Sequence, residues 1–160
     1  MIRHQSNYDI DAGFGTGSAI ARLLAKCPNK VWSKCMAKKT VLAIGIEPAF
    51  VDLSAFPGLS VELVRNYIEV QIEQIRTLGF DVENCLIDLG ETAEAVATQA
   101  LMSRRFDCVV IGAGLREPAP RLLLFEKIIN LVHSLAPQAR ICFNTTPADT
   151  ADAVRRWISA

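Results

Sequence analysis

The chain has 160 residues, with 17 basic and 17 acidic side chains, so its formal net charge at neutral pH is zero. This balance creates no positive field that would attract nucleic acid or an anionic membrane, and neither is expected as a partner. Apolar residues make up 51% of the chain, but the strongest apolar runs have the length of strands rather than of membrane-spanning helices. We therefore expect a soluble, cytoplasmic protein with a single core.

Cysteine usage also favours the cytoplasm. The chain has five cysteines and no C-x-x-C pair. Three of them, Cys85, Cys108 and Cys142, lie in predicted strands, where a free thiol behaves as a small hydrophobe. Cys27 and Cys35 have no paired histidines near them in the sequence, so no thiolate metal site is predicted.

Residues 1–39 differ in composition from the rest of the chain. Basic residues outnumber acidic ones there, and only Ser18–Lys26 has a helical pattern. The run from Met36 to Thr40 is typical of a natural bacterial amino terminus, so we expect the upstream segment to be an extension from an early start-site assignment. The segment has no secretory signal pattern. We predict a largely irregular extension over residues 1–39 and one domain over residues 40–160.

From residue 40 onward, strand-like runs alternate with helical stretches. Apolar and β-branched runs predict strands, and apolar residues at every third or fourth position predict a helix after each strand. The predicted strands are Thr40–Ile46, Asp81–Ile87, Cys108–Ile111 and Arg140–Phe143, and the predicted helices are Ser60–Leu78, Thr92–Arg105, Arg121–Leu135 and Pro147–Ile158. Gly79 is expected to end the first helix. Thr146 and Asp149 are expected to form a capping box around Pro147.

Four β-α units in series predict an α/β fold, with a four-stranded parallel sheet and helices on both faces. The expected strand order, 2-1-3-4, resembles that of response-regulator receivers and flavodoxins. In such sheets ligands bind beyond the carboxyl ends of the strands, where the strand order changes direction, here between the first and third strands. The candidate ligand-binding residues at this rim are Glu47, Gly112, Gly114, Arg116, Asn144 and Thr145.

The run Phe106–Gly114 resembles the opening strand and turn of dinucleotide-binding flavoproteins, because it ends in Gly-Ala-Gly. Glu117 stands where the third glycine of that pattern belongs, and two prolines delay the helix that would face a pyrophosphate. Two interpretations stay open. The glycines allow a sharp exit from a buried strand, or Arg116 and Arg121 hold a small anion over the turn.

The segment Asp9–Gly17 resembles motif I of S-adenosylmethionine-dependent methyltransferases, in which an acidic residue precedes a G-x-G-x-G turn. Asp11, Gly13, Gly15 and Gly17 match that motif. The resemblance implies that these residues bind S-adenosylmethionine as a cofactor.

Receiver and flavodoxin chemistry is not expected in spite of the strand order. Receivers accept phosphate on an aspartate after the third strand, where this chain has Gly112. Flavodoxins need a hydroxyl-rich loop after the first strand, where this chain is acidic and apolar. Five acidic residues could gather at the rim around a cation, but Asp88 and Glu91 are explained by capping of the next helix, so no metal site is predicted.

The connection from Glu47 to Leu59 is long for a compact domain, which is typical of a lid, a binding loop or a partner contact. It contains Phe50 and Phe56. These side chains are expected either to cover the site beside Gly112 or to close the end of the core.

The stretch from Met36 resembles the short, stand-alone α/β proteins found across bacterial genomes, in its size and in the runs Leu89–Ala95 and Leu124–Ile128. That resemblance implies no activity. We expect a non-catalytic module without a phosphoacceptor that binds a small anionic ligand or a protein partner and forms a homodimer. The alternative is an enzyme with a nucleotide-like cofactor, for which S-adenosylmethionine is the most specific candidate.

Overall fold

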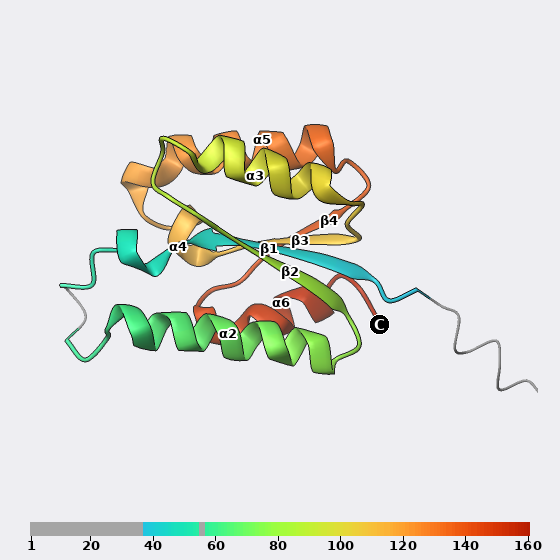
Figure 1. Ribbon diagram of the computed structural model, residues 1–160, viewed down its shortest axis with the longest axis horizontal. Helices are drawn as coiled ribbons and strands as arrows, with labels where there is room; N and C mark the ends of the chain where they lie inside the picture. Colours follow the sequence, from blue (N-terminus) through green and yellow to red (C-terminus); the bar gives the residue numbers. More distant parts are fainter. Residues whose placement is uncertain (1–36, 55–56) are drawn as a thin grey trace, which may run out of the picture. The chain divides into compact units, whose positions relative to one another are not determined.

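The structure, a computed structural model, describes residues 37–54 and 57–160 (Figure 1). Residues from Lys38 to Ala160 form one compact unit. Its sheet has four parallel strands in the order β2-β1-β3-β4. The strands are β1 (Thr40–Ile46), β2 (Asp81–Ile87), β3 (Cys108–Ile111) and β4 (Arg140–Phe143). The predicted α/β fold and strand order are confirmed. The four residues that match motif I of the methyltransferases, Asp11, Gly13, Gly15 and Gly17, lie outside the described residues. Most of the predicted extension over residues 1–39 lies outside them as well.

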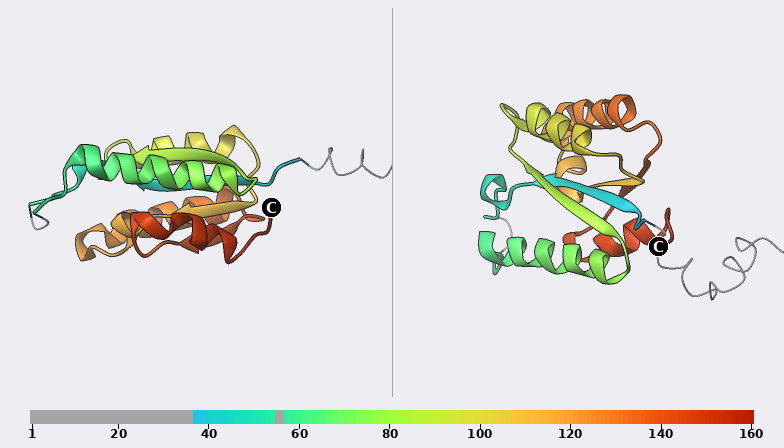
Figure 2. Two further views of the ribbon diagram at one scale, coloured as in Figure 1. Left: turned by 90° about the horizontal axis from the view of Figure 1, so that it is seen from below. Right: turned by 45° about the vertical axis from the view of Figure 1, so that its right-hand side comes forward.

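Helices cover both faces of the sheet (Figures 1 and 2). α2 (Val61–Thr77) and α6 (Thr150–Arg155) lie side by side on one face, and α3 (Ala93–Ser103) and α5 (Leu122–Leu135) lie on the other. Short turns connect these elements: the 3-10 turns η2 (Pro48–Phe50), η3 (Ala119–Arg121) and η4 (Pro147–Asp149), and the one-turn helix α4 (Ala113–Arg116).

Two details differ from the sequence predictions. The last helix begins as the 3-10 turn η4 and ends at Arg155, so α6 is shorter than the predicted span. A helical turn, α4, follows β3 directly, although the two prolines led us to expect a delay. The prolines instead start the next turn, η3, where the missing N–H of proline is tolerated.

The sheet separates two cores, where the sequence predicted one, because successive residues of a strand point to opposite faces and helices cover both faces. Leu42, Ile44 and Ile46 of β1 pack toward α3 and α5. Val41 and Ala43 pack toward α2 and α6. On this second face the side chains of β1 become smaller toward the carboxyl end of the strand, from valine to alanine to Gly45.

The expected end signals of the helices are present. Gly79 follows α2 with φ of 96°, a backbone conformation that residues other than glycine rarely adopt. The Ser60 hydroxyl accepts a hydrogen bond of 3.1 Å from the N–H of Leu63 at the start of α2. Thr146 and Asp149 form the predicted capping box before α6. The predicted roles of Gly79 and of the capping box are confirmed.

The three strand cysteines are buried, as predicted. Burial raises the pKa of the Cys85 thiol to about 11. The sulfur atoms of Cys108 and Cys142 lie 3.5 Å apart on neighbouring strands. That contact and burial raise the pKa of Cys142. Cys85 and Cys142 therefore act as neutral core side chains, whereas the hydrogen bond with Cys142 lowers the pKa of Cys108.

Candidate functional site

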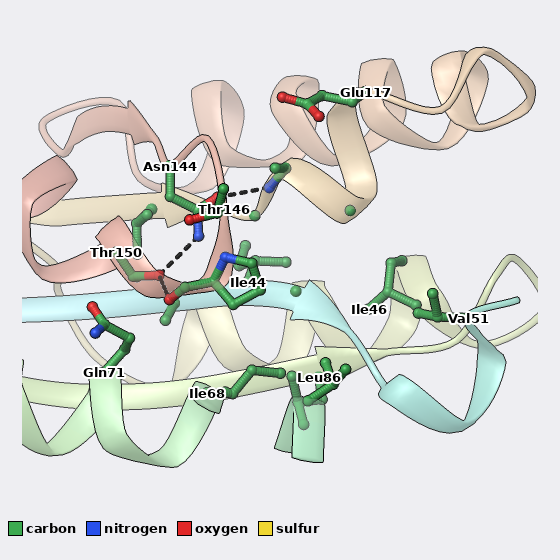
Figure 3. Close-up of a pocket in the computed structure, with 18 of the residues that line it drawn as sticks. Ile44, Ile46, Val51, Ile68, Gln71, Leu86, Glu117, Asn144, Thr146 and Thr150 are labelled. Carbon is green, nitrogen blue, oxygen red and sulfur yellow. Dashed lines mark hydrogen bonds between the residues drawn. The ribbon is translucent and has the colours of Figure 1, made fainter. Parts of the chain in front are cut away.

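A cleft of about 680 Å³ opens on the face of the sheet that carries α2 and α6 (Figure 3). It lies at the carboxyl ends of β1 and β3, where the strand order changes direction. This is the position at which ligands bind in open parallel sheets. Its volume is within the range of pockets that hold small molecules.

The floor of the cleft consists of small residues. Ala43 and Gly45 of β1 lie beside Val110 of β3 and Gly112, which follows it. A side chain at Gly112 would come within 3.5 Å of the Ile44 carbonyl oxygen, and one at Gly45 within 3.6 Å of Leu86. Because glycine has no side chain, the surface of the sheet is low at these two positions. The space between it and the facing helices forms the cleft.

The walls of the cleft are mainly apolar. Val64, Ile68 and Ile72 project from one face of α2, because residues three and four apart share a helix face. Leu86 of β2 and Val51 contribute from the other side (Figure 3). A ligand in this space would therefore bury mostly apolar surface.

Three buried polar side chains stand at one end of the cleft (Figure 3). Asn144 Oδ1 accepts a hydrogen bond of 2.7 Å from the N–H of Ala113, and its Nδ2 donates to Thr150 Oγ1 at 2.8 Å. Gln71 Oε1 accepts from the N–H of Ala151 at 3.2 Å. Gln71 and Asn144 are only 7% and 6% exposed. These bonds connect α2, α4 and α6 around one polar corner.

The backbone N–H groups that follow β4 are already occupied by a carboxylate of the chain. Asp149 accepts hydrogen bonds from the N–H groups of Thr145 and Thr146, at 3.0 and 2.9 Å, and from the Thr145 hydroxyl at 2.8 Å. Burial opposes ionisation of Asp149, but these hydrogen bonds outweigh it and lower its pKa. The donors that would hold an external anion here are therefore in use.

Of the six predicted ligand-binding residues, Gly112, Gly114, Asn144 and Thr145 line the cleft. Arg116 and Glu47 are not among the lining residues, and both have partners elsewhere.

The Arg116 guanidinium donates to the Asn144 carbonyl at 3.1 Å and to Glu117 at 3.0 Å, and it lies 5.7 Å from the centre of the Phe143 ring. Glu47 pairs with Arg65 of α2. Neither side chain lines the cleft, and each bonds to another part of the protein.

The mouth of the cleft carries two carboxylates and one arginine: Asp52, Glu117 and Arg121. Arg121 donates to the carbonyl of Gly114. The hydrogen bonds of Asp52 with Ser54 lower the pKa of Asp52. Of the two carboxylates, Glu117 is already paired with Arg116, so the cleft has no excess of positive charge for an anion.

Phe50, in the loop before α2, has neither of the two roles that the sequence predicted. Its ring is 49% exposed and does not line the cleft, so it neither covers the site nor closes the core. The neighbouring Val51 does both, because it packs against the core on the α3 side and lines the cleft. Phe56 lies outside the described residues.

Asp88 has the local role that the sequence predicts. Its carboxylate accepts from the N–H groups of Gly90 and Thr92, each at 3.0 Å, at the entrance to α3, and these bonds lower its pKa. Within residues 37–54 and 57–160, no group of three or more His, Cys, Asp or Glu residues is arranged to hold a metal ion. None of the helices in these ranges combines the length and the apolar character that a membrane crossing requires.

Several lining residues were not predicted. Ala43 and Gly45 interrupt a strand of larger side chains, and Gln71 interrupts the apolar stripe of α2 between Ile68 and Ile72. A small residue and a polar residue on otherwise buried faces are the signals that sequence inspection could have used.

Comparison of the chain with protein-family models, with curated proteins and with solved structures finds no match. The arguments about function therefore rest on the cleft itself.

Proposed function

We propose that the described domain is a non-catalytic module that binds a small molecule in the cleft between α2 and α6. The observation that supports this most directly is a cleft of about 680 Å³ with apolar walls and a buried polar corner, at the switch point of the sheet. Small-molecule sites typically combine these features: mostly apolar surface and a few fixed polar groups.

The chemistry of the lining supports binding rather than catalysis. Among the described residues that line the cleft there is no His, Cys, Lys, Ser or Tyr. The Thr150 hydroxyl, which could act as a nucleophile, donates to the Pro147 carbonyl at 3.0 Å and accepts from Asn144. No base stands beside it to activate it.

The predicted homodimer is part of this proposal. β4 is an edge strand, and α5, which packs beside it through the contact of Phe125 with Phe143, exposes Leu122 and Leu123. An edge strand next to exposed apolar side chains favours a second copy as the partner. The oligomeric state in solution tests this part.

Filling the floor of the cleft tests the binding function. Gly45→Val places a β-branched side chain on the strand, where it is tolerated, and occupies space in the cleft beside Leu86. With Nile red, a flat uncharged dye, as the probe, we expect the wild-type protein to enhance the fluorescence of the dye. The variant should bind about tenfold more weakly, or worse, which corresponds to at least about 1.4 kcal/mol.

The matched control is Gly90→Val, because Gly90 does not line the cleft and has open space around it. Its affinity for Nile red should equal that of the wild-type protein. Equal affinities of all three proteins, or no binding to the wild-type protein, would contradict the proposed site.

A further inference from the structure

In the polar corner of the cleft, hydrogen bonds fix which end of each carboxamide is the donor and which is the acceptor. The N–H of Ala113 can only donate, so the oxygen of the Asn144 carboxamide faces it and the nitrogen faces Thr150. In the same way, the N–H of Ala151 fixes the oxygen of Gln71, whose nitrogen donates to Gln74 at 2.8 Å. The two carboxamides are therefore held in known orientations.

Each of these carboxamides has capacity left. A carboxamide can donate two hydrogen bonds and accept two. The contacts of Asn144 with Ala113 and Thr150 use one acceptor site and one donor, and the contacts of Gln71 with Ala151 and Gln74 do the same. Both residues are more than nine-tenths buried, and each polar atom of the two carboxamides has one partner within the protein. A ligand that offers both a donor and an acceptor would fill the sites that remain.

The surroundings of this corner favour a flat, uncharged ligand. Ala43, Gly45 and Gly112 form a low floor on the sheet, and Ile68 faces that floor from α2 (Figure 3). An aromatic ring fits between such surfaces. The sequence predicted a small anion, but Asp149 occupies the N–H groups after β4, and the one arginine that lines the cleft, Arg121, stands with two carboxylates, Asp52 and Glu117.

We propose that the cleft binds a neutral, flat heterocycle whose edge carries a donor beside an acceptor, as in a lactam, and that Gln71 and Asn144 recognise that edge. This inference rests on the proposed binding function and specifies the ligand class. The ring lies on the floor of small residues, and its N–H and C=O groups meet the unused sites of the two carboxamides.

Three bicyclic probes of similar size separate this inference from its alternatives. Isoquinolin-1(2H)-one is a neutral lactam, its 2-methyl derivative lacks the N–H donor, and 1-naphthoate carries a negative charge. We expect the lactam to bind the full-length protein about tenfold more tightly than the methylated probe, because one buried hydrogen bond is lost. 1-Naphthoate should bind most weakly. Affinities are measured by NMR titration.

Gln71→Met keeps the shape of the side chain and removes its polar atoms. We expect it to abolish the preference for the lactam over the methylated probe, while Gln99→Met, on an exposed face of α3, leaves the preference unchanged. If the variant does not fold, the comparison of probes on the wild-type protein still decides the matter.

The outcomes distinguish the two proposals. Equal affinities for the lactam and the methylated probe, with Nile red still bound, would overturn the ligand class and leave the binding function intact. If 1-naphthoate binds most tightly, the proposed ligand class is wrong and the cleft binds an anion instead. If neither Nile red nor any probe binds, both proposals fail.

Discussion

The carboxylate of Asp149 organises the backbone between β4 and α6. It accepts hydrogen bonds from two consecutive N–H groups and from the Thr145 hydroxyl. Because the N–H groups at the start of a helix have no partners within the helix, a capping carboxylate stabilises the folded state. We expect Asp149→Ala to lower the free energy of unfolding by about 1 kcal/mol at neutral pH, measured by urea denaturation.

The effect of Asp149 should depend on pH. Its pKa in the folded protein is lower than the ordinary value of 3.8. Its contribution to stability is therefore present above about pH 3.8 and is lost as the pH falls through the lowered pKa. The difference between wild type and variant should narrow below that pH. A constant difference down to pH 2 would contradict this role of the charge.

Single residues also show how far the sequence predicted the site. Gly112, Gly114, Asn144 and Thr145 follow strands, and the carboxyl ends of parallel strands meet at one edge, so their position at the cleft was predictable. Arg116 and Glu47 were chosen for their charge, but each bonds to another part of the protein, Arg116 to the Asn144 carbonyl and Glu47 to Arg65. A sequence does not reveal which charged group has a partner.

At the scale of elements, the turn between α2 and β2 depends on Gly79. Its φ of 96° is unfavourable for any residue with a side chain, and an added Cβ would lie 3.3 Å from that of Ala160. We expect Gly79→Ala to lower the free energy of unfolding by about 1–2 kcal/mol, measured by denaturant titration. Gly90→Ala, at a position without positive φ and with open space, should stay within about 0.5 kcal/mol of wild type. Equal effects of the two changes would show that the backbone conformation is not the cause.

Elements were easier to predict than their contacts. Each of the four strands has the predicted bounds. The central strands β1 and β3 are continuous or nearly continuous apolar runs, whereas the edge strands β2 and β4 also carry exposed polar residues. The 17-residue helix α2 follows the predicted apolar period. The short helix α4 was missed because a single turn of four residues has no periodic signal.

At the scale of the whole domain, one sheet separates two cores that should unfold together. Ile75 belongs to the core under α2 and α6, and Ile128 to the core under α3 and α5, and both are fully buried. We expect Ile75→Ala and Ile128→Ala each to lower the free energy of unfolding by about 2–5 kcal/mol, in one cooperative transition followed by circular dichroism. Met102→Ala, at a residue of α3 that is 70% exposed, serves as the control and should have little effect. Two separate transitions in either core variant would show that the cores are independent.

The sequence by itself determined the α/β class, the strand order, and the end signals at Gly79 and at the capping box of Thr146 and Asp149. Hydrophobic period fixes which segments are strands or helices, and the right-handed crossover then limits how parallel strands are ordered. Only the tertiary structure decided the site. The hydrophobic period of a segment shows which of its faces is buried, but it does not show which residues of other elements lie opposite that face. Gln71 and Asn144 come to one polar corner because each bonds to the start of α6, which packs beside α2. The cleft exists because small residues of the sheet line its floor.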